Sequence, residues 1–195
     1  MYSTQPRYLK MLNRELSAVV LAGGRSTRLG QDKVLLPYHG VSFVQHQVHK
    51  LHSLGIKDIM ISGYEGPVAG TTFVPDIYPH FGPLSGMHAG LSAIMNTAAL
   101  VLAVDTPLLP VQLLGALAEA HSGGITIVEH GGKMEPLIGV YDSALAAVCE
   151  EILLSGRRSV HALLDRVGYR TICYQGDEKL LLNCNTPEDY ALLTE

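Results

Sequence analysis

The sequence predicts an α/β protein, a three-layer α/β/α sandwich whose sheet is mostly parallel with a small antiparallel part. Apolar segments of strand length alternate with segments of helix length along the 195 residues, as in parallel sheets covered by helices. Residues 16–22 are an uncharged run closed by Gly23-Gly24, which indicates a strand buried on both faces. The Gly131-Gly132 pair between two strand-like segments predicts an antiparallel hairpin.

The individual elements follow from apolar runs and from their flanking Gly, Pro and capping residues. Strands are predicted at residues 16–22, 57–62, 71–75, 99–104, 125–130, 133–141, 169–174 and 180–183. Helices are predicted at residues 42–54, 87–96, 110–121, 143–154 and 160–167, with a terminal helix from residue 186. Ser42 is the expected cap of the first helix and Gly55 its end.

Composition excludes several classes of function. A hydrophobic content of 47% with 16% charged residues favours a globular chain over a disordered one. The net charge of −4 offers no basic surface for nucleic acid, and no apolar run is long enough to span a membrane. The three cysteines form no paired motif, which favours reduced thiols and a cytoplasmic location.

The loop after the first strand combines glycines with cations. Gly23-Gly24 and Gly30 allow the backbone to approach a ligand closely, and Arg25, Arg28 and Lys33 supply positive charge. A buried strand, a glycine turn and clustered cations together indicate a phosphate site, although a glycine pair alone is also common in plain turns. The spacing fits neither a Walker loop nor a dinucleotide-binding turn.

The segment L-A-G-G-R-S-T-R-L-G-Q-D-K resembles the signature loop of the nucleotidyltransferase superfamily, and within it the molybdenum cofactor guanylyltransferases. The resemblance runs from about Ser17 to the C-terminus. It implies a Rossmann-like, glycosyltransferase-A-like fold, with residues 16–195 as one nucleotidyltransferase domain after a disordered leader at residues 1–15.

The resemblance also implies an activity. GMP would pass from GTP to molybdopterin or its molybdenum-loaded form, with release of pyrophosphate and with Mg²⁺ as cofactor. Transient contacts with metal-insertion proteins, apo-molybdoenzymes or their chaperones are expected. Three alternatives remain open: a molybdopterin cytidylyltransferase, another small-substrate nucleotidyltransferase such as one acting on sugar phosphates, and a non-catalytic nucleotide-binding partner in cofactor insertion.

Asp105, Lys33 and Arg28 are the expected catalytic residues. A carboxylate at the end of an uncharged strand is costly to bury without a partner or a metal, although Asp105 could also simply begin the turn before the next helix. The resemblance assigns the acid of the D-x-P motif, Asp105, to the metal. Lys33 and Arg28 would neutralise the phosphates, unless they form a solvated pair.

The remaining site residues are divided between two substrates. The resemblance places Asp76 in the nucleotide site, and Ser62 stands where family members often carry Asn. The full nucleotide-binding set is Leu21, Ala22, Gly23, Gly24, Lys33, Ser62, Asp76 and Asp105. The pterin-binding set is Gly82, Pro83 and Leu84 of the G-P-L-S-G turn, with Asn183 and Asn185.

The two asparagines have a second interpretation. Asn183 and Asn185 alternate at the end of the strand predicted at residues 180–183, so one face could present two amides to a pterin. Alternatively, Asn185 or Thr186 caps the last helix. The motif Glu135-Pro136-Leu137 also matches the family.

Overall fold

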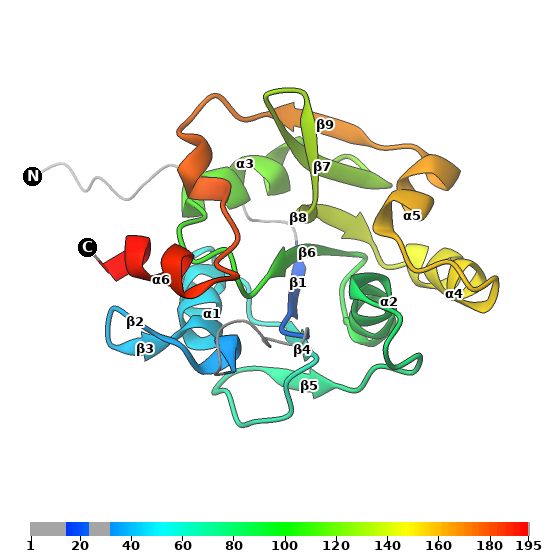
Figure 1. Ribbon diagram of the computed structural model, residues 1–195. Helices are drawn as coiled ribbons and strands as arrows, with labels where there is room; N and C mark the ends of the chain where they lie inside the picture. Colours follow the sequence, from blue (N-terminus) through cyan, green and yellow to red (C-terminus); the bar gives the residue numbers. More distant parts are fainter. Residues whose placement is uncertain (1–14, 24–31, 195) are drawn as a thin grey trace, which may run out of the picture.

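The computed structural model describes residues 15–23 and 32–194; the predicted site residues Gly24 and Arg28 therefore lie outside the described part. The described residues form a seven-stranded sheet in the order β5-β4-β1-β6-β8-β7-β9 (Figure 1). Its strands are β1 (Ser17–Leu21), β4 (Ile59–Ser62), β5 (Thr72–Val74), β6 (Ala98–Ala103), β7 (Ile125–His130), β8 (Lys133–Asp142) and β9 (Arg170–Cys173). Within this sheet β8 alone runs against its neighbours.

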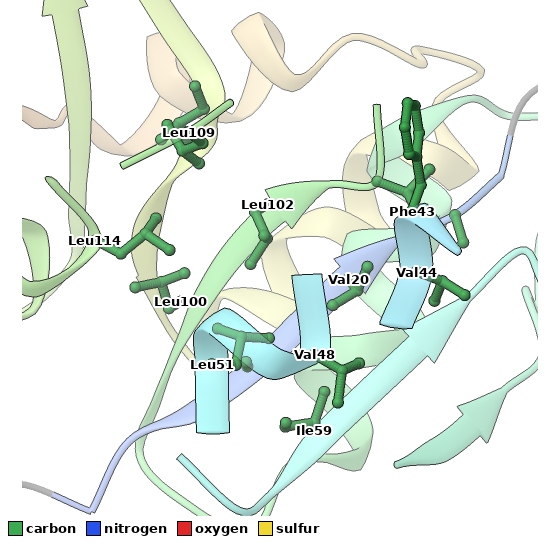
Figure 2. Close-up of a cluster of buried hydrophobic side chains, with 14 of the residues drawn as sticks. Val20, Phe43, Val44, Val48, Leu51, Ile59, Leu100, Leu102, Leu109 and Leu114 are labelled. Atoms are coloured by element: carbon green, nitrogen blue, oxygen red, sulfur yellow. The ribbon is translucent and has the colours of Figure 1, made fainter. Parts of the chain in front are cut away.

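The central strand β1 is buried on both faces. Ala18 and Val20 pack into one hydrophobic cluster, and Val19 and Leu21 pack into a second cluster on the opposite face. Side chains alternate along a strand, so an unbroken apolar run supplies both layers of core at once. Figure 2 shows Val20 between Val48 and Leu102 in the first cluster.

Helices cover both faces of the sheet. The first cluster lies under α1 (Phe43–Ser53) and α3 (Val111–Ala120), and α6 (Pro187–Thr194) packs at its edge. The second cluster lies under α2 (Pro83–Ala93), α4 (Leu145–Leu154) and α5 (Val160–Val167) (Figure 1). The three-layer α/β/α sandwich with a mostly parallel sheet is therefore confirmed.

The chain order places a crevice at the carboxyl end of β1. From β1 the chain passes through α1 to β4 on one side, and later through α2 to β6 on the other side. Where successive connections lead to opposite sides of a strand, a crevice forms at its carboxyl end, and open α/β sheets bind ligands in such a crevice. Residues 22–23, 63–64 and 104–105 follow these three strands.

Several local predictions are confirmed. Ser42 and Gln45 form a reciprocal capping box at the start of α1. The Gly131-Gly132 turn joins β7 and β8 as an antiparallel hairpin, and both glycines have positive φ.

Other predictions are wrong. Residues 180–183 form no strand, because Asp177 caps a 3₁₀ helix, η3 (Glu178–Leu181), that takes up this leucine-rich stretch. The helix predicted at residues 87–96 begins at Pro83 and ends at Ala93. Residues 33–42 contain η2 (Lys33–Leu35) and a short hairpin of β2 (Pro37–Tyr38) and β3 (Val41–Ser42) that the sequence did not predict.

None of the helices within residues 15–23 and 32–194 combines the length and the apolar character needed to cross a membrane.

Candidate active site

A cavity of about 950 Å³ opens at the carboxyl ends of β1, β4 and β6. The N-terminus of α2 and the segment before α6 also contribute to its wall. The lining residues are Leu21, Gly23, Lys33, Ser62, Gly63, Tyr64, Glu65, Phe73, Pro75, Asp76, Pro79, His80, Gly82, Pro83, Gly86, Ala103, Val104, Asp105, Leu137 and Asn183.

Lys33 and Asp105 form an ion pair in this cavity. Lys33 Nζ donates to Asp105 Oδ2 at 2.7 Å, and both side chains are mostly buried, at 12% and 13% exposure. Lys33 lies in η2 after the glycine loop, while Asp105 is the second residue after β6. A pair so shielded from water keeps more of its electrostatic interaction than an exposed pair does.

The second carboxylate oxygen of Asp105 has a different environment. Oδ1 is buried and has no hydrogen-bond partner among the described residues. An orphaned buried carboxylate oxygen is costly unless a cation or donor occupies the site in the working protein. Carboxylate oxygen is also the ligand that Mg²⁺ and Mn²⁺ prefer, so the donor chemistry fits a divalent metal.

A metal at Asp105 would share its ligands with a substrate. In residues 15–23 and 32–194 no group of three His, Cys, Asp or Glu side chains gathers to hold an ion. Mg²⁺ is commonly bound by one or two carboxylates together with substrate phosphates and water. One carboxylate such as Asp105, together with phosphate oxygens and water, would be enough ligands for such an ion.

The segment before α6 closes one side of the cavity. Asn185 Oδ1 accepts a hydrogen bond from Lys33 Nζ at 3.2 Å, and the backbone N–H of Cys184 donates to the Asp105 carbonyl at 2.7 Å. Asn183 lines the cavity. The strand-end geometry predicted for these two asparagines is wrong, because both follow η3 in an irregular segment.

The cap of α6 is Thr186. Its hydroxyl accepts from the Asp189 N–H at 3.1 Å, and Asp189 Oδ2 accepts from the N–H groups of Asn185 and Thr186 at 2.9 and 2.8 Å. These hydrogen bonds, above all the one from Asn185, lower the pKa of Asp189 below its ordinary value. The cap interpretation thus holds for Thr186, while the Asn185 side chain faces Lys33.

The opposite wall is built on β4. The Ser62 hydroxyl donates to Asp76 Oδ1 at 2.5 Å, which joins the end of β4 to the residue two positions after β5. Gly86 on α2 packs against this pair: a Cβ there would lie 2.7 Å from Ser62 Oγ and 2.9 Å from Leu21 Cδ2. The second glycine of G-P-L-S-G therefore allows α2 to approach the sheet.

The structure gathers most of the predicted site residues. Leu21, Gly23, Lys33, Ser62, Asp76, Gly82, Pro83, Asp105 and Asn183 line the cavity, and Asn185 contacts Lys33. Ala22 and Leu84 do not line it: both side chains are buried, and that of Leu84 lies in the second core cluster. Any contribution they make comes from their backbone.

Gly63 is a cavity residue that sequence reasoning did not assign. Its φ is +84°, and a Cβ at this position would lie 2.3 Å from the Cα of Gly23. The ends of β1 and β4 thus touch through their backbones, which only glycine allows. Its position directly after a predicted strand was the available signal. Tyr64, Glu65, Phe73 and His80 also line the cavity and carried no motif.

The buried cysteines are poorly suited to act as nucleophiles. Burial, aided by the carboxylates of Asp189 and Asp105, raises the pKa of Cys184 to about 11. Burial also raises the pKa of Cys149 to about 12. A thiol is reactive as its thiolate, so both side chains are inert near neutral pH.

Comparison with known proteins identifies the family of this fold and cavity. The sequence matches the MobA-like NTP transferase domain over residues 18–173. The chain belongs to this family. It is therefore a nucleotidyltransferase, as the sequence predicts.

Several known proteins resemble this chain along nearly its whole length. A probable molybdenum cofactor guanylyltransferase from Carboxydothermus hydrogenoformans is 31% identical over 188 residues, covering 92% of this chain and 95% of the relative. Molybdopterin-guanine dinucleotide biosynthesis protein A from Archaeoglobus fulgidus has the same fold, with a TM-score of 0.73, 23% identity and coverage of 91% and 96%. A Mycobacterium tuberculosis protein solved as a manganese complex superimposes with a TM-score of 0.68 at 16% identity, covering 92% and 97%.

Proposed function

We propose that this protein transfers GMP from GTP to molybdopterin, or to its molybdenum-loaded form, and releases pyrophosphate. The product is a molybdopterin guanine dinucleotide cofactor. The Carboxydothermus hydrogenoformans relative, which aligns with this chain over 95% of its length, is named a probable molybdenum cofactor guanylyltransferase, and this supports the choice of substrates.

The observation that carries the proposal is the state of Asp105. One carboxylate oxygen is paired with Lys33, and the other is buried without a partner among the described residues. This arrangement lies in a cavity at the carboxyl ends of parallel strands. It offers a cation for phosphate oxygens and an anion for a metal, side by side, as phosphoryl transfer requires.

The chemical step needs no protein nucleophile. An oxygen of the terminal phosphate of molybdopterin forms a bond to the α-phosphorus of GTP, and the bond from that phosphorus to the bridging oxygen of the pyrophosphate breaks. The attacking phosphate is already ionised near neutral pH, so no side chain has to remove a proton. Catalysis then consists of positioning the reactants and stabilising charge.

Lys33 and Asp105 supply these two effects. Lys33 neutralises charge that develops on the phosphates, and Asp105 Oδ1 would hold a divalent metal. When bound, the metal screens the negative charges of the two substrates from each other. Mg²⁺ is the proposed ion, and Arg28 and Gly24 are proposed to complete the phosphate loop.

The two substrates are proposed to occupy different parts of the cavity. The Ser62–Asp76 pair, with the backbone of residues 21–23, is proposed to bind the nucleoside. Gly82, Pro83, Asn183 and Asn185 are proposed to bind the pterin, with Leu84 contributing through its backbone. Transient docking with metal-insertion proteins and apo-molybdoenzymes, and a cytoplasmic location, complete the proposal.

A turnover assay tests the proposal. Purified protein is incubated with molybdopterin, Mg²⁺ and GTP, CTP or ATP, and pyrophosphate and the dinucleotide product are measured. We expect turnover with GTP and little with CTP or ATP. Equal or faster turnover with CTP would make the protein a cytidylyltransferase, and binding of GTP without product would make it a non-catalytic nucleotide-binding protein.

A further inference from the structure

The backbone segment that carries Asp105, residues 103–107, is held by side chains from α1. Gln47 is fully buried, and its Nε2 donates to the Thr106 carbonyl at 2.9 Å and to the Ala103 carbonyl at 3.3 Å. One turn further along the helix, Lys50 Nζ donates to the Pro107 carbonyl at 2.6 Å. These are polar contacts on the sheet-facing side of α1, among apolar neighbours such as Val48 and Leu51 (Figure 2).

Every carbonyl of residues 103–107 has a partner. Gln47 also contacts the Val104 carbonyl at 3.5 Å, and the Asp105 carbonyl accepts from the Cys184 N–H at 2.7 Å. His46 Nε2 lies 3.0 Å from the Pro107 carbonyl, which also accepts from Lys50. Buried carbonyl groups normally find donors, but a short turn between strand and helix cannot supply them from its own backbone alone. Side chains of α1 supply donors to the Ala103, Val104, Thr106 and Pro107 carbonyls, and Cys184 supplies the donor to the Asp105 carbonyl.

The orientation of the Gln47 amide follows from its neighbours. Three backbone carbonyls surround one end of the amide, so the NH₂ group faces them and the oxygen points away. Gln47 Oε1 has no hydrogen-bond partner among the described residues, although it is buried. The amide group of Gln47 therefore contacts the 103–107 segment through its donors alone.

We propose that Gln47 and Lys50 are positioning residues that hold the 103–107 segment so that Asp105 Oδ1 faces the metal and triphosphate. They touch neither substrate nor metal and act through the backbone of residues 103–107. This inference rests on the proposed function, because it concerns the metal-binding role of Asp105. Replacing a residue that orients a metal ligand without touching the metal typically lowers metal affinity or activity by roughly 10- to 100-fold.

The test measures Mn²⁺ binding without turnover. Free Mn²⁺ is followed by electron paramagnetic resonance in the presence of GTP and in the absence of pterin, for the wild type and for Gln47→Met, Lys50→Met and Val48→Ala. Gln47→Met and Lys50→Met keep the approximate side-chain length and remove the donors. Val48→Ala is the matched control, because Val48 lies beside Gln47 on α1 and packs in the core.

We expect Gln47→Met to weaken Mn²⁺ binding by roughly tenfold or more, and Val48→Ala to leave it within about twofold of the wild type. In turnover, Gln47→Met raises the metal concentration for half-maximal rate and leaves the KM for GTP at saturating metal unchanged. Urea unfolding shows whether each variant is folded, and Lys50→Met replaces Gln47→Met if the latter is not.

Two other outcomes overturn the inference in distinguishable ways. Folded Gln47→Met and Lys50→Met proteins that bind Mn²⁺ as Val48→Ala does would show that these side chains have only a structural role, and the proposed function would stand. A wild-type protein that binds no Mn²⁺ in the presence of GTP would remove the metal role of Asp105, and the positioning role with it.

Discussion

Lys33 and Asp105 are 72 residues apart in the chain, yet the ammonium group of Lys33 donates to the Asp105 carboxylate at 2.7 Å in the cavity. The pair joins the end of the glycine loop to the end of β6. Lys33 also donates a hydrogen bond to Asn185. The second carboxylate oxygen of Asp105 is buried without a partner among the described residues. The two residues therefore act as a unit.

We predict that Lys33→Met and Asp105→Asn each lower the rate of pyrophosphate release by about a hundredfold or more. Each variant removes a charged side chain that is proposed to stabilise the transfer of the phosphoryl group. The double variant is expected to be little slower than the slower single variant, since residues of one catalytic unit are not additive. Steady-state kinetics on proteins with native circular dichroism measure this. Full activity in either folded single variant would contradict the assigned role.

Gly63→Ala is predicted to destabilise the protein more than Gly55→Ala does. Both glycines have similar positive φ, +84° and +81°, so both variants incur the left-handed strain of about 1 to 2 kcal/mol. A Cβ at position 63 would also lie 2.3 Å from Gly23 Cα, whereas at position 55 it meets no described atom within 4 Å. The clash should cost a further 1 to 3 kcal/mol, about the penalty of overpacking. Urea unfolding measures both, and equal losses would disprove the close approach of β1 and β4.

Lys50→Met is predicted to change the pH dependence of stability. Burial lowers the pKa of Lys50 from 10.5 to about 7. Between these pH values the unfolded chain holds a proton that the folded chain does not, so the free energy of unfolding of the wild type rises with pH relative to the variant. The slope is at most about 1.4 kcal/mol per pH unit, and it vanishes below pH 7 and above pH 10.5. Urea unfolding at several pH values measures this. If the difference in free energy of unfolding between the wild type and Lys50→Met does not change with pH over this window, the burial of this amine is contradicted.

The same variant should alter His46. Burial first, and then the charge of Lys50, lowers the pKa of His46 to about 4, with smaller effects of the same sign from His39 and His49. Replacing Lys50 removes one of these causes, so the pKa of His46 is expected to rise. Titration of the His46 ring by NMR in the wild type and in Lys50→Met measures the change. An unchanged His46 titration would show that the two groups do not interact.

Thr186→Ala is predicted to lower the free energy of unfolding by about 1 kcal/mol, the usual cost of losing a helix cap. Because Asp189 also holds the N–H of Asn185, a loosened cap should raise the KM for molybdopterin. Thr186→Ser retains the hydroxyl and serves as the control, with stability and KM near those of the wild type. A Thr186→Ala protein that loses stability but keeps the wild-type KM would exclude Asn185 from the pterin site.

Much of the fold and of the site was predictable because the signals are local. The apolar run of β1, the Gly131-Gly132 hairpin and the Ser42 cap depend on neighbouring residues, and all three are confirmed. That the ends of β1 and β6 lie at one edge of the sheet follows from topology, whereas the Lys33–Asp105 contact itself comes from the structure.

The features that were missed depend on distances that no local pattern encodes. Gly63 matters because its backbone touches Gly23, and Gln47 matters because its amide reaches residues 103–107. The stretch at residues 180–183 has strand-like composition, but the Asp177 cap and the contact of Cys184 with the Asp105 carbonyl hold the region as a 3₁₀ helix and an irregular segment. Tertiary contacts override local preference at such places.

The most direct measurement is mass spectrometry of the pterin product after incubation with molybdopterin, Mg²⁺ and equal concentrations of GTP and CTP, for the wild type and Asp105→Asn. We predict that the wild type forms the guanine dinucleotide, releasing one pyrophosphate for each molecule, and that Asp105→Asn forms about a hundredth as much or less. A wild-type protein that forms the cytosine dinucleotide or no dinucleotide, or an Asp105→Asn protein that is as active as the wild type, would contradict guanylyl transfer at the Lys33–Asp105 site.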